Sequence, residues 1–196
     1  MKLLNNHPNK LVAFVFRVVL GFCVALGITQ VSIADNAPIS THKFQLEVSA
    51  LSVTKESESG GDEVYLSIVE YSNYGKSSYF RVPSYPTYWL AKHLKSVKKV
   101  RLWEHEFSNG EATQLIVSIV ERDLPPWNVD DLIGAIKINL HQKDGALIVE
   151  WDPHHFQNEA KVDEKEPGKP VFVLNGNDSV YEISFDTIIE RINEKS

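Results

Sequence analysis

Apolar and polar residues alternate along much of the chain from residue 43 onward, which is the pattern of β-strands that bury one face. Phe44, Leu46 and Val48 form the first row of expected buried positions. Segments of the same character follow at regular intervals: 51–53, 63–71, 78–82, 100–107, 114–120, 135–140, 146–151, 171–174 and 180–185. Turn-forming residues separate them, and Asn175-Gly176 is the clearest hairpin signal. Short strands joined by turns predict an all-β fold, an antiparallel β-sandwich or barrel.

The pattern is less regular in three places. Residues 83–95 are ambiguous, because Pro83 and Pro86 interrupt the pattern. They could form a short helix or a strand. Residues 157–170 carry many charges together with proline and glycine, which predicts a long exposed loop. Residues 186–195 fit a short C-terminal helix with Asp186 as its N-cap. No internal repeat is visible, so we expect a single domain over residues 43–196.

The first 34 residues have the composition of a secretory signal peptide. Basic residues precede a continuous apolar run over residues 18–28, and small residues end the segment at Ala34. The alternative is an uncleaved membrane anchor, for which the run is short. We expect cleavage after Ala34, a flexible leader over residues 35–42, and a product that is periplasmic or secreted. Cys23 is the only cysteine and lies in the apolar run, so the mature chain would contain no disulfide.

Charge narrows the classes of partner. Removing Lys2, Lys10 and Arg17 leaves 17 basic residues against 26 acidic ones, a net charge of −9. A domain with this balance lacks the positive face that phosphate recognition needs, which argues against nucleic acid as the partner.

The carboxylates gather in two loops. Glu56 and Asp62 lie between the first two predicted strands, and Glu121, Asp123 and Asp131 lie around the end of the strand over residues 114–120. Loops that meet at one end of a sandwich would bring these groups together, where they repel unless a cation neutralises them. Calcium suits such a cluster because it takes six to eight oxygen ligands from flexible loops.

At these two loops the sequence resembles the C2 family. An alternating strand, FQLEVSALSV, leads to Glu56, a glycine pair, Asp62 and a tyrosine-bearing strand. Later, LIVSIV ends in Glu121-Arg122-Asp123, and Asp131 precedes Leu132-Ile133-Gly134. The resemblance covers residues 44–140. It implies a β-sandwich of about eight strands, with calcium held by five carboxylates: Glu56, Asp62, Glu121, Asp123 and Asp131.

Two departures from the family pattern concern the ligands. Glutamate stands at two positions where the family usually has aspartate, and the second loop is about two residues longer than usual. The competing interpretation of all these acids is ordinary solvated surface.

Two other features could either contact a membrane or have a purely structural role. Leu124 and Trp127 lie in the second loop, where apolar tips of C2 domains dip into bilayers, but Trp127 could equally fold back over the end of the sandwich. Lys98 and Lys99 belong to a basic stretch that would meet anionic headgroups, or would simply protect a strand edge.

The leading hypothesis is therefore a non-enzymatic, exported, calcium-binding module for an anionic partner such as phospholipid, or for a protein. The first alternative is an exported metal-dependent hydrolase that uses Asp152, His154 and His155, a set able to hold zinc. The second is an adhesive or structural β-sandwich that needs no metal.

Overall fold

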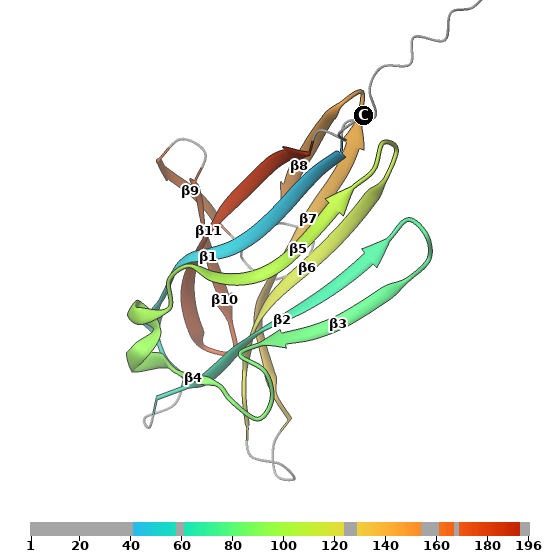
Figure 1. The fold of residues 1–196 in the computed structure, drawn as a ribbon. Helices are drawn as coiled ribbons and strands as arrows, with labels where there is room; N and C mark the ends of the chain where they lie inside the picture. The colour runs from blue at the N-terminus through green and yellow to red at the C-terminus, as the bar shows by residue number, and fades with distance from the viewer. Residues whose placement is uncertain (1–40, 58–60, 124–128, 154–160, 167–168, 193–196) are drawn as a thin grey trace, which may run out of the picture. The chain divides into compact units, whose positions relative to one another are not determined.

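A computed structural model describes residues 41–57, 61–123, 129–153, 161–166 and 169–192. Within these residues the chain forms two antiparallel sheets, which confirms the predicted all-β fold (Figure 1). One sheet has the order β5-β1-β11-β10-β9 and the other the order β3-β2-β6-β7-β8, with β4 paired to β2. The strands are β1 (Thr41–Lys55), β2 (Glu63–Ser72), β3 (Ser77–Val82), β4 (Trp89–Leu90), β5 (Val100–Phe107), β6 (Ala112–Glu121), β7 (Asp131–Lys143), β8 (Ala146–Asp152), β9 (Lys161–Glu166), β10 (Lys169–Gly176) and β11 (Ser179–Ile192).

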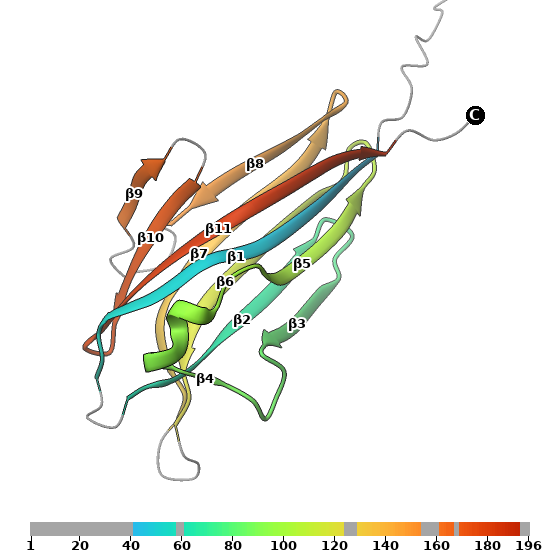
Figure 2. The same ribbon diagram turned by 60° about the vertical axis from the view of Figure 1, so that its left-hand side comes forward.

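The two sheets bury the rows of apolar residues that the alternation predicted. Phe44, Leu46 and Val48 of β1 are fully buried, and buried residues of β2, β5, β6, β7, β10, β11 and the segment 91–97 also belong to the core. Burying a large apolar side chain contributes about 1.5–3 kcal/mol, so this core is the main source of stability. The pairing of β1 with β11 runs along the whole length of both strands, from Thr41↔Ile192 to Lys55↔Val180 (Figure 2).

The two sheets approach one another closely where β7 meets β10. A Cβ at Gly134 would lie 2.8 Å from the Cβ of Leu174, and a Cβ at Gly176 would overlap the carbonyl oxygen of Ile133. Glycine at these two positions allows the backbones to pack at this distance.

Two local predictions were wrong at the ends of the domain. Thr41 and His42 belong to β1 rather than to a leader, because they pair with the end of β11. Residues 186–192 continue β11 as a strand rather than forming a helix. They contain Thr187, Ile188 and Ile189, whose β-branched side chains favour an extended backbone, and β1 supplies the pairing partners.

The charged segment and one turn also differ from expectation. Residues 161–166, expected in a loop, form β9 against β10. The β10–β11 turn is made by Asn177 and Asp178, both with positive φ, whereas the predicted turn residues Asn175 and Gly176 pair within the strands. Asparagine and aspartate adopt this backbone conformation more readily than other non-glycine residues.

Residues 83–95 contain both of the structures that the sequence allowed. β4 is followed directly by a 3-10 helix, η1 (Ala91–Ser96), whose Ala91 and Leu94 are buried. The predicted signal segment and most of the leader lie outside the described residues. No helix among the described residues has the length and apolar character needed to cross a membrane.

Candidate metal site at the acidic end

The two acidic loops are attached to the same end of the sandwich. β1 ends, β2 begins, β6 ends and β7 begins at the lower end of Figure 1. Glu121 at the end of β6 is paired with Val64 of β2 on one side and with Asp131 of β7 on the other. The strand register therefore brings acids of the two loops together at one end of the sandwich, which we call the acidic end.

Asp62 is the most enclosed carboxylate of this end. The residue is fully buried. Its Oδ2 accepts hydrogen bonds from the hydroxyls of Tyr181, at 2.5 Å, and Ser179, at 3.0 Å. Both hydroxyls come from the start of β11, so the β10–β11 turn lies next to the first acidic loop. Hydrogen bonds to a carboxylate favour its ionised form and offset part of the cost of burying it.

Ser57 connects Asp62 to the second loop. Its Oγ lies 3.4 Å from Oδ1 of Asp62 and 3.1 Å from both carboxylate oxygens of Glu121, which is also buried. A serine hydroxyl has one proton to donate, so it cannot bond to three carboxylate oxygens at once. The two acids thus face one another across a single hydroxyl.

Glu56 approaches the same place. Its Oε2 lies 3.3 Å from the position that a Cβ on Gly61 would take, directly beside Asp62. Burial raises the pKa of the Tyr181 phenol most, and the hydrogen bond to Asp62 and the charges of Asp62, Glu121 and Glu56 raise it further. Three of the five predicted ligands therefore act on one phenol.

The remaining predicted ligands lie at the start of β7 and after β6. A carboxylate oxygen of Asp131 accepts a hydrogen bond of 2.6 Å from the Asn177 side chain. Oδ2 of Asp123 is buried and has no hydrogen-bond partner among the described residues, although the Asp123 amide donates to Asp130. Asp130 also accepts a 2.8 Å hydrogen bond from Tyr65, which ties it to the outer face of β2.

This donor set has the chemistry of a calcium site without its closed geometry. Carboxylate and hydroxyl oxygens converge, and one buried carboxylate oxygen is left without a partner in the described part of the chain. No group of three or more His, Cys, Asp or Glu side chains in that part is arranged to hold a metal ion. Calcium at the acidic end would therefore require the carboxylates of Glu56, Asp123 and Asp131 to turn toward Asp62 and Glu121.

Sequence reasoning missed the hydroxyl groups of this end. Ser57, Ser179 and Tyr181 contact the acids but follow no charge pattern. A signal for Tyr181 was present, because it is the first aromatic residue in the inward row of the strand that continues with Ile183 and Phe185. A tyrosine at the end of a buried row directs its hydroxyl out of the core toward the loops.

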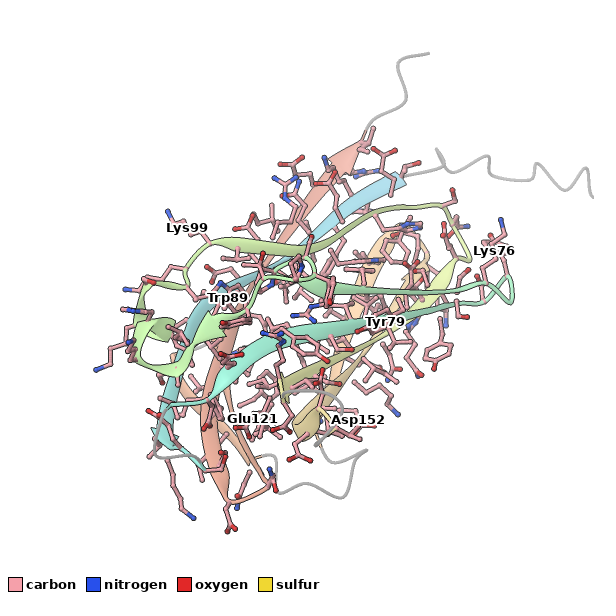
Figure 3. All side chains as sticks on the ribbon, turned by 90° about the horizontal axis from the view of Figure 1, so that it is seen from below. Lys76, Tyr79, Trp89, Lys99, Glu121 and Asp152 are labelled. Carbon is pink, nitrogen blue, oxygen red and sulfur yellow. The ribbon has the colours of Figure 1, made fainter. Side chains whose placement is uncertain are left out.

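The predicted membrane contacts are described only in part. Leu124 and Trp127 lie outside the described residues. Lys98 and Lys99 are exposed in the turn between η1 and β5, and Lys99 lies apart from Glu121 in Figure 3. Arg101, the last residue of the basic stretch, forms an ion pair with Glu104 at 3.0 Å and approaches Glu47 to 4.0 Å.

The alternative zinc set is described only in part. Asp152 at the end of β8 forms an ion pair of 2.7 Å with Lys137 of β7. His154 and His155 lie outside the described residues. The geometry of the described part thus gives Asp152 an ionic partner on the sheet.

The chain was compared with protein families and with curated proteins. No family model and no curated protein matches it. Its function must therefore be argued from its own residues.

Proposed function

We propose that this protein is an exported calcium-binding module of the C2 type, which uses its acidic end to engage an anionic partner such as phospholipid. One observation carries the proposal: Asp62 and Glu121, from separate loops, face one another across the Ser57 hydroxyl. A divalent cation in this position would interact with both carboxylates, whereas the single proton of Ser57 satisfies one at a time.

Electrostatics supports a cation here. The carboxylates of Asp62 and Glu121 both lie within 3.4 Å of the Ser57 Oγ, so their negative charges repel one another. Glu56 and Asp131 add to this repulsion because they lie beside Asp62 and Glu121. Calcium would convert the repulsion into attraction and would order the two loops. The bound ion would also give an otherwise negative end a centre that accepts an anionic headgroup.

The sheets are compatible with the C2 resemblance. β5-β1-β11-β10 and β3-β2-β6-β7 together provide eight strands, and β8 and β9 extend the sheets at one side. The two acidic loops join strands of this eight-stranded unit, as the resemblance implies.

The test is the thermal midpoint of the protein with chelator, with millimolar calcium and with millimolar magnesium. Because an extracellular calcium site has a Kd of about 10⁻⁴–10⁻³ M, several millimolar calcium should stabilise the native state by about 1–2 kcal/mol. For a domain of this size that corresponds to a rise of about 2–8 °C. Magnesium should give a smaller rise, since it requires a more rigid octahedral site.

Matched variants locate the effect. Asp62→Asn and Glu121→Gln should each abolish the calcium-dependent rise, whatever their effect on the midpoint in chelator. Asp144→Asn is the control, because Asp144 is an exposed turn acid with positive φ, a conformation that asparagine tolerates. An equal calcium response in all three variants would show that the ion binds elsewhere. No response in the unchanged protein would favour the metal-independent adhesive function.

Phospholipid binding is tested separately on vesicles containing phosphatidylserine. Binding that needs calcium and is lost in Asp62→Asn supports the lipid partner. Calcium binding without vesicle binding would support the calcium site and would indicate an anionic partner other than phospholipid.

A further inference from the structure

A second surface of the molecule lies at the end opposite the acidic loops. A hollow of about 370 Å³ opens on the outer face of the β3-β2-β6-β7-β8 sheet, where β2 ends, β6 begins and β7 ends. This region is at the upper right of Figure 1, where the β2–β3, β5–β6 and β7–β8 turns lie. Residues that line it include Tyr71, Asn73, Ala112, Gln114, Asn139 and His141.

The strand register explains the shape of the hollow. Tyr71, Gln114 and Asn139 are direct neighbours across β2, β6 and β7, and successive strands lie about 4.8 Å apart. They form one row of side chains on the outer face. In the next row Ala112 is paired with His141, and its short side chain leaves an empty space between longer neighbours.

Two amide side chains in the hollow bond to one another and can still bond to a ligand. Nε2 of Gln114 donates to Oδ1 of Asn139 at 2.9 Å. This bond leaves the amide oxygen of Gln114 as an acceptor and the amide nitrogen of Asn139 as a donor, on two residues paired across β6 and β7. A pair of neighbouring hydroxyls on a ligand matches this acceptor and donor.

Tyrosine rings border these amides. Tyr71 is 47% exposed and Tyr79 is 61% exposed. Tyr79 is paired with Val69, two residues before Tyr71 on the same strand, so both rings belong to the outer face. Figure 3 shows Tyr79 on the edge strand β3. Exposed rings of this kind present a flat apolar surface beside a polar hydroxyl.

Among the described residues, no Lys, Arg, Asp or Glu side chain lines the hollow, although the whole chain has 46 such residues among 196, 20 basic and 26 acidic. An anionic ligand would gain no counter-charge from this lining, and the exposed Glu150 of β8, which is paired with Asn139 on the same face, would repel it. Its volume is within the range of sites for small molecules, whereas a protein partner needs about 800 Å² of surface on each side.

We propose that this hollow binds a neutral oligosaccharide. The C–H face of a pyranose ring would lie on Tyr71, and two vicinal hydroxyls would bond to the amides of Gln114 and Asn139. The ring of Tyr79 lies further along β2 and β3, where the next sugar unit would contact it. The site is independent of calcium, because the acidic end lies at the opposite ends of β2 and β6.

The test uses immobilised neutral hexasaccharides of glucose, N-acetylglucosamine, mannose, xylose and galactose, with polygalacturonate as the charged comparison. We expect binding to at least one neutral chain and none to polygalacturonate. Calorimetry with the bound hexasaccharide then gives Kd in the presence of chelator, which separates this site from the acidic end.

Three variants test the location. Tyr71→Ala, Gln114→Ala and Ala112→Leu, which fills the hollow, should each raise Kd about tenfold or more. Tyr85→Ala is the matched control, since Tyr85 is an exposed tyrosine in the segment between β3 and β4, and it should leave Kd within about twofold. All four variants change side chains on the surface, so their thermal midpoints should stay close to that of the unchanged protein.

Three results would overturn the proposal. They are no binding to any neutral hexasaccharide, preferential binding to polygalacturonate, and binding that none of the three variants in the hollow weakens.

Discussion

The hydroxyl of Tyr181 lies where the core of the sandwich meets the acidic end. Its ring is packed among the apolar residues between the sheets, and its oxygen donates to the buried carboxylate of Asp62. A single side chain thus belongs to both the core and the candidate site. Loss of this hydrogen bond would raise the cost of burying the Asp62 carboxylate.

Tyr181→Phe keeps the ring and removes the donor. Because a buried carboxylate that loses a hydrogen bond pays part of its desolvation cost, we expect the free energy of unfolding in chelator to fall by about 1–3 kcal/mol. Urea denaturation measures this difference. Tyr85→Phe is the control, since Tyr85 is 76% exposed, and it should change stability by less than about 0.5 kcal/mol. Equal stability of both variants would mean that the Tyr181 bond to Asp62 contributes nothing net.

At the same scale, the sequence predicted acids better than their neutral partners. The spacing of Glu56, Asp62 and Glu121 around two strand ends was enough to predict that they converge, because strand ends fix where loops begin. Ser57 and Ser179 could not be found in this way. A serine near a turn is common, and only the tertiary fold decides whether its hydroxyl faces a carboxylate.

At the scale of elements, β7 and β10 hold the two sheets together at a point where no side chain fits. The backbone at Gly176 lies against the carbonyl groups of Leu132 and Ile133. Contacts between backbones cannot be relieved by a change of side-chain rotamer. Alanine at position 176 would therefore force the strands apart.

We expect Gly176→Ala to lower the free energy of unfolding by about 3 kcal/mol, at the upper end of the cost of overpacking. Gly75→Ala serves as the comparison, because Gly75 has a φ of +73° but nothing within 4 Å of its missing Cβ. That variant carries only the cost of the left-handed backbone, about 1–2 kcal/mol. Urea denaturation of both proteins gives the ranking. A smaller cost at position 176 than at position 75 would contradict the close packing of β7 on β10.

Strands were predicted correctly where the alternation of apolar and polar residues agrees with the face that the strand buries in the fold. β2, β5 and β6 show clear alternation and appear where expected. Residues 186–192 were expected to be helical from the spacing of their isoleucines, but the partner strand β1 was long enough to pair with them. Residues 161–166 were expected in a loop because of their charge, and β10 supplied their pairing. In both segments pairing with another strand decided the structure: the remote strand β1 in the first case and the following strand β10 in the second.

At the scale of the whole molecule, an all-β sandwich follows from the series of short alternating strands, because each has only one face to bury. The order of strands within the sheets does not follow from this pattern. β1 lies between β5 and β11, and β2 lies beside β6, so these three pairings join strands that are distant in sequence. The hollow on the outer sheet face depends on this order, since its row of Tyr71, Gln114 and Asn139 exists only when β2, β6 and β7 are adjacent.

The whole domain should lose stability above pH 10, and two tyrosines at the acidic end are the reason. Burial raises the pKa of Tyr65 and Tyr181 above the ordinary value of 10.0, and hydrogen bonds to Asp130 and Asp62, respectively, raise each further. In the unfolded chain both phenols lose their protons near pH 10, while in the folded protein they keep them. The folded state then binds more protons, so the free energy of unfolding falls as pH rises above 10. Below pH 10 both states are protonated, and the stabilisation from these two groups is fully present.

Urea denaturation at pH values on either side of 10 measures this decline, and the variant with both Tyr65→Phe and Tyr181→Phe identifies its source. The variant starts from a lower stability, because it has lost two donors to carboxylates. Its stability should nevertheless decline less steeply above pH 10, since neither position can ionise in the unfolded chain. Replacing Tyr74 and Tyr85, which are both exposed, by phenylalanine provides a control with the same number of tyrosines. An alkaline decline as steep in the Tyr65 and Tyr181 variant as in this control would assign the loss of stability to other groups.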